Sequence, residues 1–168
     1  MPHQDDPPST TEPDAPALSV QAGEHLAAKR YAAAVALYER ALALDAQRAP
    51  DWINQGLALW NLQRHEQALA YHDRALALVP GDALAWMNRG NALNGLKRFP
   101  EALACYDRAI ELNPRLATAR YNKGDELGRQ SRIIEARACF ENARELGMAQ
   151  AAEMVRYCEQ ILANEFYG

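Results

Sequence analysis

Between residues 83 and 116, apolar positions follow two helical patterns separated by a short polar break. They recur at spacings of three and four residues at Trp86, Gly90, Leu93 and Leu96, and again at Ala102, Tyr106, Ala109 and Ile110. This spacing places each set on one face of an α-helix. The break between them puts Pro100 in the first turn of the second helix, where no backbone N–H is needed, and Asn113-Pro114 ends that helix. The segment predicts two antiparallel helices joined by a tight turn.

The same pattern occurs four times at a strict interval of 34 residues. Columns that keep one residue type include Ala34, Ala68, Ala102 and Ala136, and also Leu44, Leu78, Leu112 and Leu146. Four copies in register predict four helical hairpins over residues 17–150, with the first reaching back to Ala15. The units are 15–48, 49–82, 83–116 and 117–150. Stacked hairpins of this kind form an elongated all-α array rather than a globule.

A glycine inside each of the last three predicted first helices has a packing explanation. Gly56, Gly90 and Gly124 share one column. A glycine in a helix interior costs up to ~1 kcal/mol relative to alanine. We therefore expect the first helix to approach its partner helix closely at this point.

These positions closely resemble the signature of the tetratricopeptide repeat family, which reads Trp, Leu/Gly, Tyr, Ala, Phe, Ala, Pro. The third unit carries it as Trp86, Gly90, Leu93, Ala102, Tyr106, Ala109 and Pro114. The resemblance covers residues 15 to 150 and implies a right-handed solenoid whose first helices line a concave groove. One departure is the position before each glycine, where Gln55, Arg89 and Lys123 replace the family's frequent leucine. We expect looser packing along that edge.

The two ends of the chain differ from the repeats. Residues 1–16 hold four acidic residues, no lysine or arginine and five of the nine prolines, so they predict a disordered acidic tail. Residues 151–168 place Met154, Cys158 and Ile161 on one helical face. We expect a helix to about residue 165 that caps the stack. Phe166 and Tyr167 either pack back on the stack or form an exposed aromatic end.

Charge and composition exclude several classes of partner. The net charge is −4, and without the four acids of residues 1–16 the acidic and basic residues are equal in number. A neutral body with an acidic tail lacks the basic surface that nucleic acids and anionic membranes require. The chain shows no secretory signal pattern and no apolar run near the ~20 residues of a membrane span. Three cysteines without close pairs fit a reducing compartment, so a cytoplasmic protein is expected.

An asparagine recurs in the predicted groove. Asn54, Asn88 and Asn122 lie two residues after the tryptophan column, about 200° around the helix. They should therefore leave the core of each hairpin and face the groove. Each amide carries a donor and an acceptor, so it can bond a peptide's C=O and N–H whatever its side chain. The alternative is that these asparagines increase solubility or form hydrogen bonds between helices.

Neighbouring positions complete the predicted peptide-binding site. The residues expected to supply apolar anchors and further polar contacts are Ile53, Leu57, Met87, Asn91, Tyr121 and Asp125. Trp60, Asn94 and Arg129 lie on the same face of their helices. Val20 occupies the asparagine column in the first unit, so the ladder should work over units two to four. The columns that match the family's carboxylate clamp for chaperone C-termini contain no basic residue here. That resemblance therefore implies no clamp of this kind.

No pattern of catalytic, cofactor-binding or metal-ligating residues is present. His25, His65 and His72 occupy columns that hold Leu, Tyr, Phe or Ile in other units, so they indicate packing substitutions. No glycine-rich phosphate loop, nucleophile elbow or zinc-binding spacing occurs. We predict a non-catalytic, monomeric adaptor that needs no cofactor and holds an extended segment of another protein. The alternative is a self-associating module that uses its terminal helix or an exposed repeat end.

Overall fold

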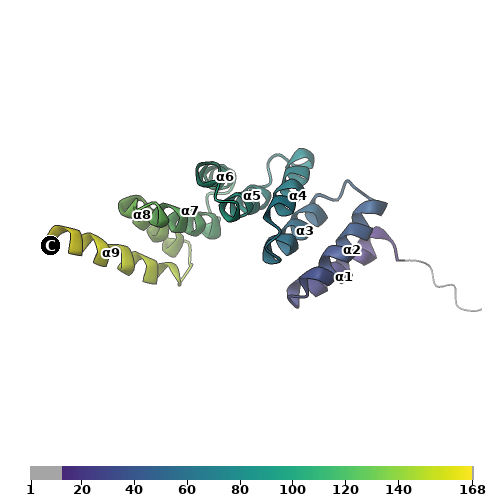
Figure 1. The fold of residues 1–168 in the computed structure, drawn as a ribbon, viewed down its shortest axis with the longest axis horizontal. Helices are drawn as coiled ribbons and strands as arrows, with labels where there is room; N and C mark the ends of the chain where they lie inside the picture. The colour runs from purple at the N-terminus through teal and green to yellow at the C-terminus, as the bar shows by residue number, and fades with distance from the viewer. Residues whose placement is uncertain (1–12, 168) are drawn as a thin grey trace, which may run out of the picture.

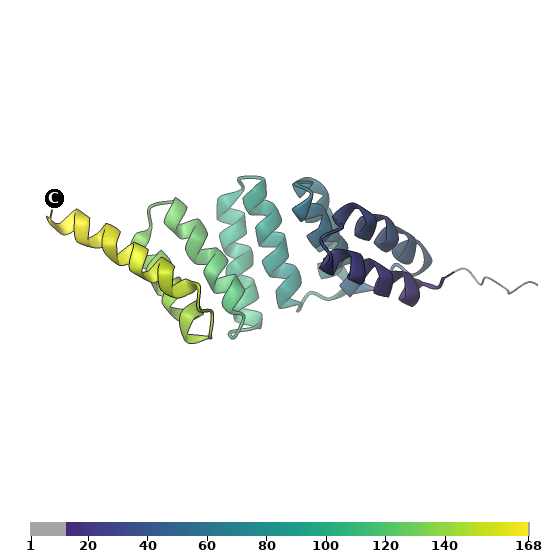
Figure 2. The ribbon, with the colours of Figure 1, turned by 90° about the horizontal axis from the view of Figure 1, so that it is seen from below.

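The computed structural model describes the backbone of residues 13–167 and the side chains of residues 13–164. Within this range the chain forms helices and no strand. The helices are α1 (Ala15–Ala27), α2 (Tyr31–Leu44), α3 (Ala49–Asn61), α4 (His65–Leu78), α5 (Ala83–Gly95), α6 (Phe99–Leu112), α7 (Ala117–Arg129), α8 (Ile133–Glu145) and α9 (Ala151–Tyr167). They run in chain order from one end of an elongated array to the other (Figures 1 and 2). The prediction of an all-α helical-repeat solenoid is confirmed.

Each hairpin turns through one residue in the left-handed conformation. These residues again repeat every 34 positions, and all have a φ near 60°: Lys29, Gln63, Lys97 and Ser131. The N–H of the next residue closes each first helix, as Arg98 does by donating to the Leu93 carbonyl at 2.9 Å. This is the usual way to satisfy the last carbonyls of a helix. The turn fixes the angle at which the second helix folds back.

The first helix starts earlier than the tail prediction allowed. Residues 15 and 16 were expected in the tail, but they are the first two residues of α1. The Asp14 side chain accepts a hydrogen bond from the Ala17 N–H at 2.9 Å, and Pro16 lies in the first turn. An aspartate cap and an early proline both favour a helix start here. Residues 1–12, on which most of the tail prediction falls, lie outside the described residues.

Each glycine of the glycine column leaves space for a buried ring from the second helix of its hairpin. A Cβ atom built on Gly90 would lie 2.6 Å from a ring carbon of Tyr106. Gly56 faces His72 and Gly124 faces Phe140 in the same manner. A side chain at any of these three glycines would have to displace the buried ring of its own hairpin. In the first hairpin the same column holds Ala22.

The edge before each glycine is closed by ion pairs across the unit boundaries. Arg89 Nε lies 2.7 Å from Asp73 of the preceding unit, and Lys123 Nζ lies 2.5 Å from Asp107. The expected looser packing at these two positions is therefore replaced by polar links between hairpins. The corresponding Gln55 makes no such link and is fully buried.

The successive first helices contact one another, α1 with α3, α3 with α5 and α5 with α7, which places them on the inner side of the array. The terminal helix α9 packs on α8 and buries Ala151, Val155 and Cys158. The side chains of Phe166 and Tyr167 lie outside the described residues. No helix in the described range combines the length and the hydropathy that crossing a bilayer would need.

Candidate functional site

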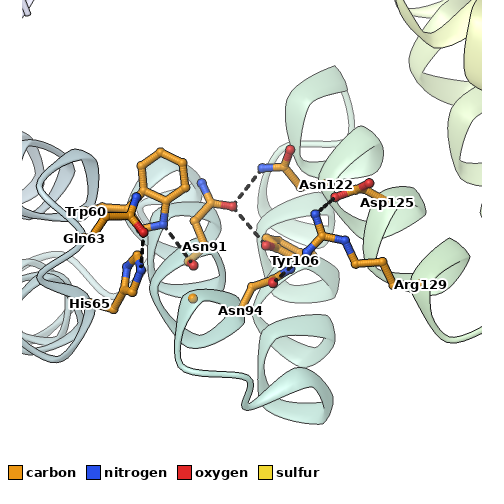
Figure 3. A pocket seen from close by; sticks show the side chains of 10 residues that line it. Trp60, Gln63, His65, Asn91, Asn94, Tyr106, Asn122, Asp125 and Arg129 are labelled. Carbon is orange, nitrogen blue, oxygen red and sulfur yellow. Dashed lines mark hydrogen bonds and ion pairs between the residues drawn. The ribbon is translucent and has the colours of Figure 1, made fainter.

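The main depression of the inner face lies between α5 and α7 and has a volume of about 370 Å³. Figure 3 shows the side chains that surround it, which come from three successive units. Most of its lining residues carry polar side chains. The lining residues are Trp60, Gln63, His65, Asn91, Asn94, Gly95, Tyr106, Asn122, Asp125 and Arg129. We call this the polar pocket.

Asn91 is the centre of the hydrogen bonds in the polar pocket. Its side-chain oxygen accepts from the Tyr106 hydroxyl at 2.9 Å and from the Asn122 amide at 2.8 Å (Figure 3). Its backbone carbonyl accepts from the Trp60 indole N–H at 3.2 Å. Three units therefore converge on one residue, and the amide oxygen is assigned by its two donors. The side chains of the pocket are held in place before any ligand arrives.

A buried carboxylate supports the second asparagine of the pocket. Glu126 is 1% exposed and accepts from Asn94 at 3.0 Å and from Gln130 at 2.7 Å. Both donors are uncharged amides, and each carboxylate oxygen has one of them. Buried polar groups must be satisfied in this way to avoid a large desolvation cost. Asn94 is consequently fixed in orientation.

The charged wall of the pocket is more exposed. Arg129 and Asp125 form an ion pair at 2.9 Å, with side-chain exposures of 60% and 41%. Such a pair contributes little to stability because water screens it. Its two charges cancel, so the polar pocket has no strong net charge from its walls.

Burial raises the pKa of the Tyr106 hydroxyl well above its usual range, and the neighbouring Asn94 side chain only partly offsets this. The hydroxyl therefore stays protonated and remains a donor to Asn91 at any physiological pH. His65 contributes a half-buried ring whose Nε2 lies 3.2 Å from the Gln63 side chain.

The pocket retains unused hydrogen-bonding capacity. Among the side chains described, neither the amide nitrogen of Asn91 nor the amide oxygen of Asn122 takes part in a hydrogen bond. One is a donor and the other an acceptor, and a peptide unit needs both. The arrangement can bind an uncharged, hydrogen-bonding chain. The polar groups that line it are amides, a phenol, an imidazole, an indole and an ion pair.

Three of the predicted site residues meet in the polar pocket: Asn91, Asn122 and Asp125. Asn54 lies one unit away beside the buried Tyr38 hydroxyl, whose pKa is raised by burial and partly lowered again by this amide. Asn88 is only 8% exposed. The asparagine column therefore also serves contacts between units, which was the alternative interpretation of the sequence.

The predicted apolar anchors are largely occupied by packing. Met87 is 9% exposed and belongs to a core cluster with Leu93 and Ala102, so its side chain is not free to anchor a ligand. Ile53 packs against the cluster formed around Leu76. The Tyr121 ring stacks edge-on against Phe140, with centroids 5.2 Å apart. Leu57 is half-buried on α3.

Trp60, Asn94 and Arg129, which were expected on the groove face, also line the pocket. Gln63, His65 and Tyr106 line it as well and were not expected there. Tyr106 was assigned to packing, like Phe140 in the same repeat column. Unlike phenylalanine, a buried tyrosine carries a hydroxyl that needs a hydrogen-bond partner. The 34-residue column of Leu57, Asn91 and Asp125 becomes polar only in units three and four. That change is the signal that could have located the pocket.

Comparison with known proteins supports the fold. The tetratricopeptide repeat family is matched at residues 83–116, the span of the third unit, and again at residues 52–81. No curated protein matches the chain at a significant level.

Solved structures share the architecture at low sequence identity. TTC0263, a thermophilic tetratricopeptide repeat protein of Thermus thermophilus, is 20% identical, with a TM-score of 0.78 over 88% of this chain and 82% of its own. MamA from Desulfovibrio magneticus RS-1 is 21% identical, with a TM-score of 0.73 over 82% of this chain and 77% of its own. The first TPR of Spaghetti (RPAP3), solved bound to the HSP90 peptide SRMEEVD, is 22% identical, with a TM-score of 0.67 over 70% of this chain and 94% of its own. Residues 52–81 and 83–116 are therefore matched as tetratricopeptide repeats, and the solved structures show the same solenoid fold for most of the chain.

Proposed function

We propose that the chain is a non-catalytic interaction module that holds an extended segment of another protein along the inner face of units two to four. The contact would be centred on the polar pocket. Asn91 and Asn122 would bond the backbone of the segment, and the surrounding groove would add side-chain contacts. Asn54 and the exposed part of Leu57 would extend the contact toward α3.

The observation that carries this proposal is the pair of unused polar atoms in the polar pocket. The Asn91 amide nitrogen and the Asn122 amide oxygen sit on two side chains that already bond each other at 2.8 Å. They are therefore close enough to bond the C=O and N–H of one residue of an extended peptide, which point to the same side of the chain. The Tyr106 hydroxyl holds the Asn91 side chain in place. A pre-organised site loses less side-chain entropy on binding, which favours affinity.

The chemistry of the walls supports an uncharged stretch of peptide. Neutral amides and one internally compensated ion pair surround the pocket. The similar structure solved with a bound peptide supports a peptide ligand for this fold. The carboxylate-clamp mode is not proposed for this chain, because the matching columns lack basic residues.

The test is selection of random dodecapeptides displayed on phage against the full chain, followed by affinity measurement with fluorescein-labelled peptides. Asn122→Ala should weaken the selected peptides about fivefold, as expected for losing one peptide hydrogen bond. The matched control is Asn142→Ala on α8, where an exposed asparagine donates to the Ala138 carbonyl. Thermal melting checks that both variants fold. Equal affinities for Asn122→Ala and Asn142→Ala would contradict the proposal.

A further inference from the structure

A second pocket, with a volume of about 270 Å³, lies directly beside the polar pocket, between α7, α8 and α9. The two pockets share Asp125 and Arg129, whose ion pair forms the wall between them. The other lining side chains are mainly apolar: Ile133, Phe140, Met154, Tyr157, Cys158 and Ile161, with Gly128 at the edge. We call this the apolar pocket.

The apolar pocket exists because one column of the repeat shrinks at α7. The residues of this column are Leu26, Trp60, Asn94 and Gly128. Leu26 packs against the core of the first units, and the Trp60 indole reaches Asn91. At Gly128 no side chain fills the equivalent space, and an added Cβ would lie 3.9 Å from Ala136, an ordinary contact. The space is therefore open without strain.

The terminal helix supplies the opposite wall. Counted back by 34 residues, Cys158 and Ile161 correspond to Gly124 and Leu127, which α7 turns toward its own partner helix. In α9 this face lines the apolar pocket instead. Met154 and Ile161 are half-buried there, and Tyr157 is 56% exposed. Apolar side chains that remain open to water gain free energy when a ligand covers them.

We propose that the apolar pocket takes one bulky apolar side chain, of leucine, methionine or phenylalanine, from the peptide held in the polar pocket. This inference rests on the proposed function of the polar pocket. The two pockets are adjacent and share one wall, so one extended chain can cross both. Neighbouring helices lie about 8–10 Å apart and an extended chain rises about 3.3 Å per residue. The anchor therefore follows or precedes the clamped peptide unit by about three residues.

The occupant is apolar rather than charged for two reasons. Among the described residues, the only charged groups lining the apolar pocket are Asp125 and Arg129, and they compensate each other. The volume suits a single large side chain, being smaller than the usual range for whole small-molecule ligands. The ligand class is thus an extended segment with one large apolar residue near a stretch that needs only backbone contacts.

The test fills the apolar pocket with a side chain and measures whether the apolar residue of the peptide still contributes to binding affinity. Gly128→Leu restores the residue type found at Leu26, so it should fold. The probes are the fluorescein-labelled dodecapeptides selected on the wild-type chain, each compared with the same peptide carrying alanine at its shared apolar position. In the wild type this alanine should weaken binding about tenfold or more. In Gly128→Leu it should weaken binding less than about twofold, because the pocket is already occupied.

Two further variants keep the outcome interpretable. Ala138→Leu adds the same bulk on an exposed position of α8 and should leave the tenfold effect intact. Tyr157→Asp places a charge on an exposed wall residue, so it should reduce the anchor effect even if Gly128→Leu does not fold.

The two proposals fail in different ways. If Asn122→Ala weakens binding but the anchor effect persists unchanged in Gly128→Leu and Tyr157→Asp, the apolar pocket is not the anchor site and the polar pocket stands. Selected peptides without a shared apolar position would also overturn the inference. If no variant changes binding, or no peptide is selected, both proposals are contradicted.

Discussion

Units two and three of the array, residues 49–82 and 83–116, share one backbone pattern but treat their buried polar groups differently. In unit three the ring in the glycine-facing column is Tyr106, whose hydroxyl bonds Asn91 at 2.9 Å. In unit two it is His72, fully buried, with neither ring nitrogen hydrogen-bonded to any described group. Burial lowers the pKa of His72 to about 4, with Asp73 opposing the shift.

The position before the glycine repeats this contrast. In unit three Arg89 pairs with Asp73 at 2.7 Å and donates to the Cys105 sulfur at 3.1 Å. In unit two Gln55 is fully buried, and neither atom of its amide has a hydrogen-bond partner of acceptable geometry within the described residues. The solenoid thus tolerates unsatisfied polar atoms in unit two, whereas the unit beside the polar pocket satisfies them. We infer that unit two is the less stable of the pair.

The largest expected effect is a loss of folding stability when the pH is lowered. His72 is neutral in the folded chain, and the unfolded chain takes up its proton as the pH falls through 6.5. Stability is therefore complete above pH 6.5 and falls as the pH drops toward 4, by about 3 kcal/mol from this group. Urea unfolding at pH 7, 5 and 4, followed by tryptophan fluorescence, measures the change in the free energy of unfolding.

His72→Phe is the control for the acid effect. Phenylalanine already occupies this column at Phe140 against Gly124, so the ring should fit. The variant should lose most of the pH dependence between pH 7 and pH 4. An equal pH dependence in the wild type and the variant would mean that His72 is not the titrating group.

The next largest effect is expected at Gln55. Gln55→Leu removes two buried polar atoms without partners and should raise the free energy of unfolding by about 1–3 kcal/mol. Urea unfolding at pH 7 measures the change. The same substitution at the exposed Gln67 should change stability by less than about 0.5 kcal/mol. A loss of stability in Gln55→Leu would show that the amide has a partner in solution.

In unit three, removing a buried polar group should instead destabilise the folded chain. Tyr106→Phe removes the donor to Asn91 and should cost about 1 kcal/mol, the typical worth of one hydrogen bond. Peptide affinity should fall as well, because Asn91 loses a constraint. Thermal melting and peptide binding are measured beside Tyr31→Phe, a half-buried tyrosine outside the pocket. Unchanged stability and affinity would argue against the network around Asn91.

The smallest effect is expected at the ion pairs between units. Asp73→Asn breaks a pair whose carboxylate is 51% exposed and should cost less than about 1 kcal/mol. The difference from the wild type should shrink further in 0.5 M salt, since exposed charges are screened. A large loss that does not depend on salt would show that Asp73 acts through something other than charge pairing with Arg89.

The fold was predictable from the sequence because its determinants are local and repeated. Spacings of three and four residues define the helices, and the 34-residue columns define the stack. The glycine column, the alanine column and the turn position all recur in the structure. The packing at Arg89 and Lys123 differed from expectation because their partners lie in the preceding unit. The start of α1 differed because Asp14 caps the helix within the predicted tail.

The site was harder to predict because it depends on contacts between units. Asn91, Asn122 and Asp125 do meet in the polar pocket, but the oxygen of Asn91 is shared between α6 and α7. Met87 was expected in the groove and is in the core, since the rotation of each helix in its hairpin is set by packing. The apolar pocket needs the small Gly128 of one repeat column, but its opposite wall comes from α9, which packs on α8 and lies outside the four predicted units.

The most direct test of the central claim is a ¹⁵N NMR titration of the chain with one selected dodecapeptide. The account predicts that the side-chain amides of Asn91 and Asn122 and the Trp60 indole N–H shift together, while the Asn142 amide on α8 stays unchanged. Shifts confined to α8, α9 or the outer helices would contradict the account. Signals that broaden with protein concentration before any peptide is added would instead favour a self-associating module.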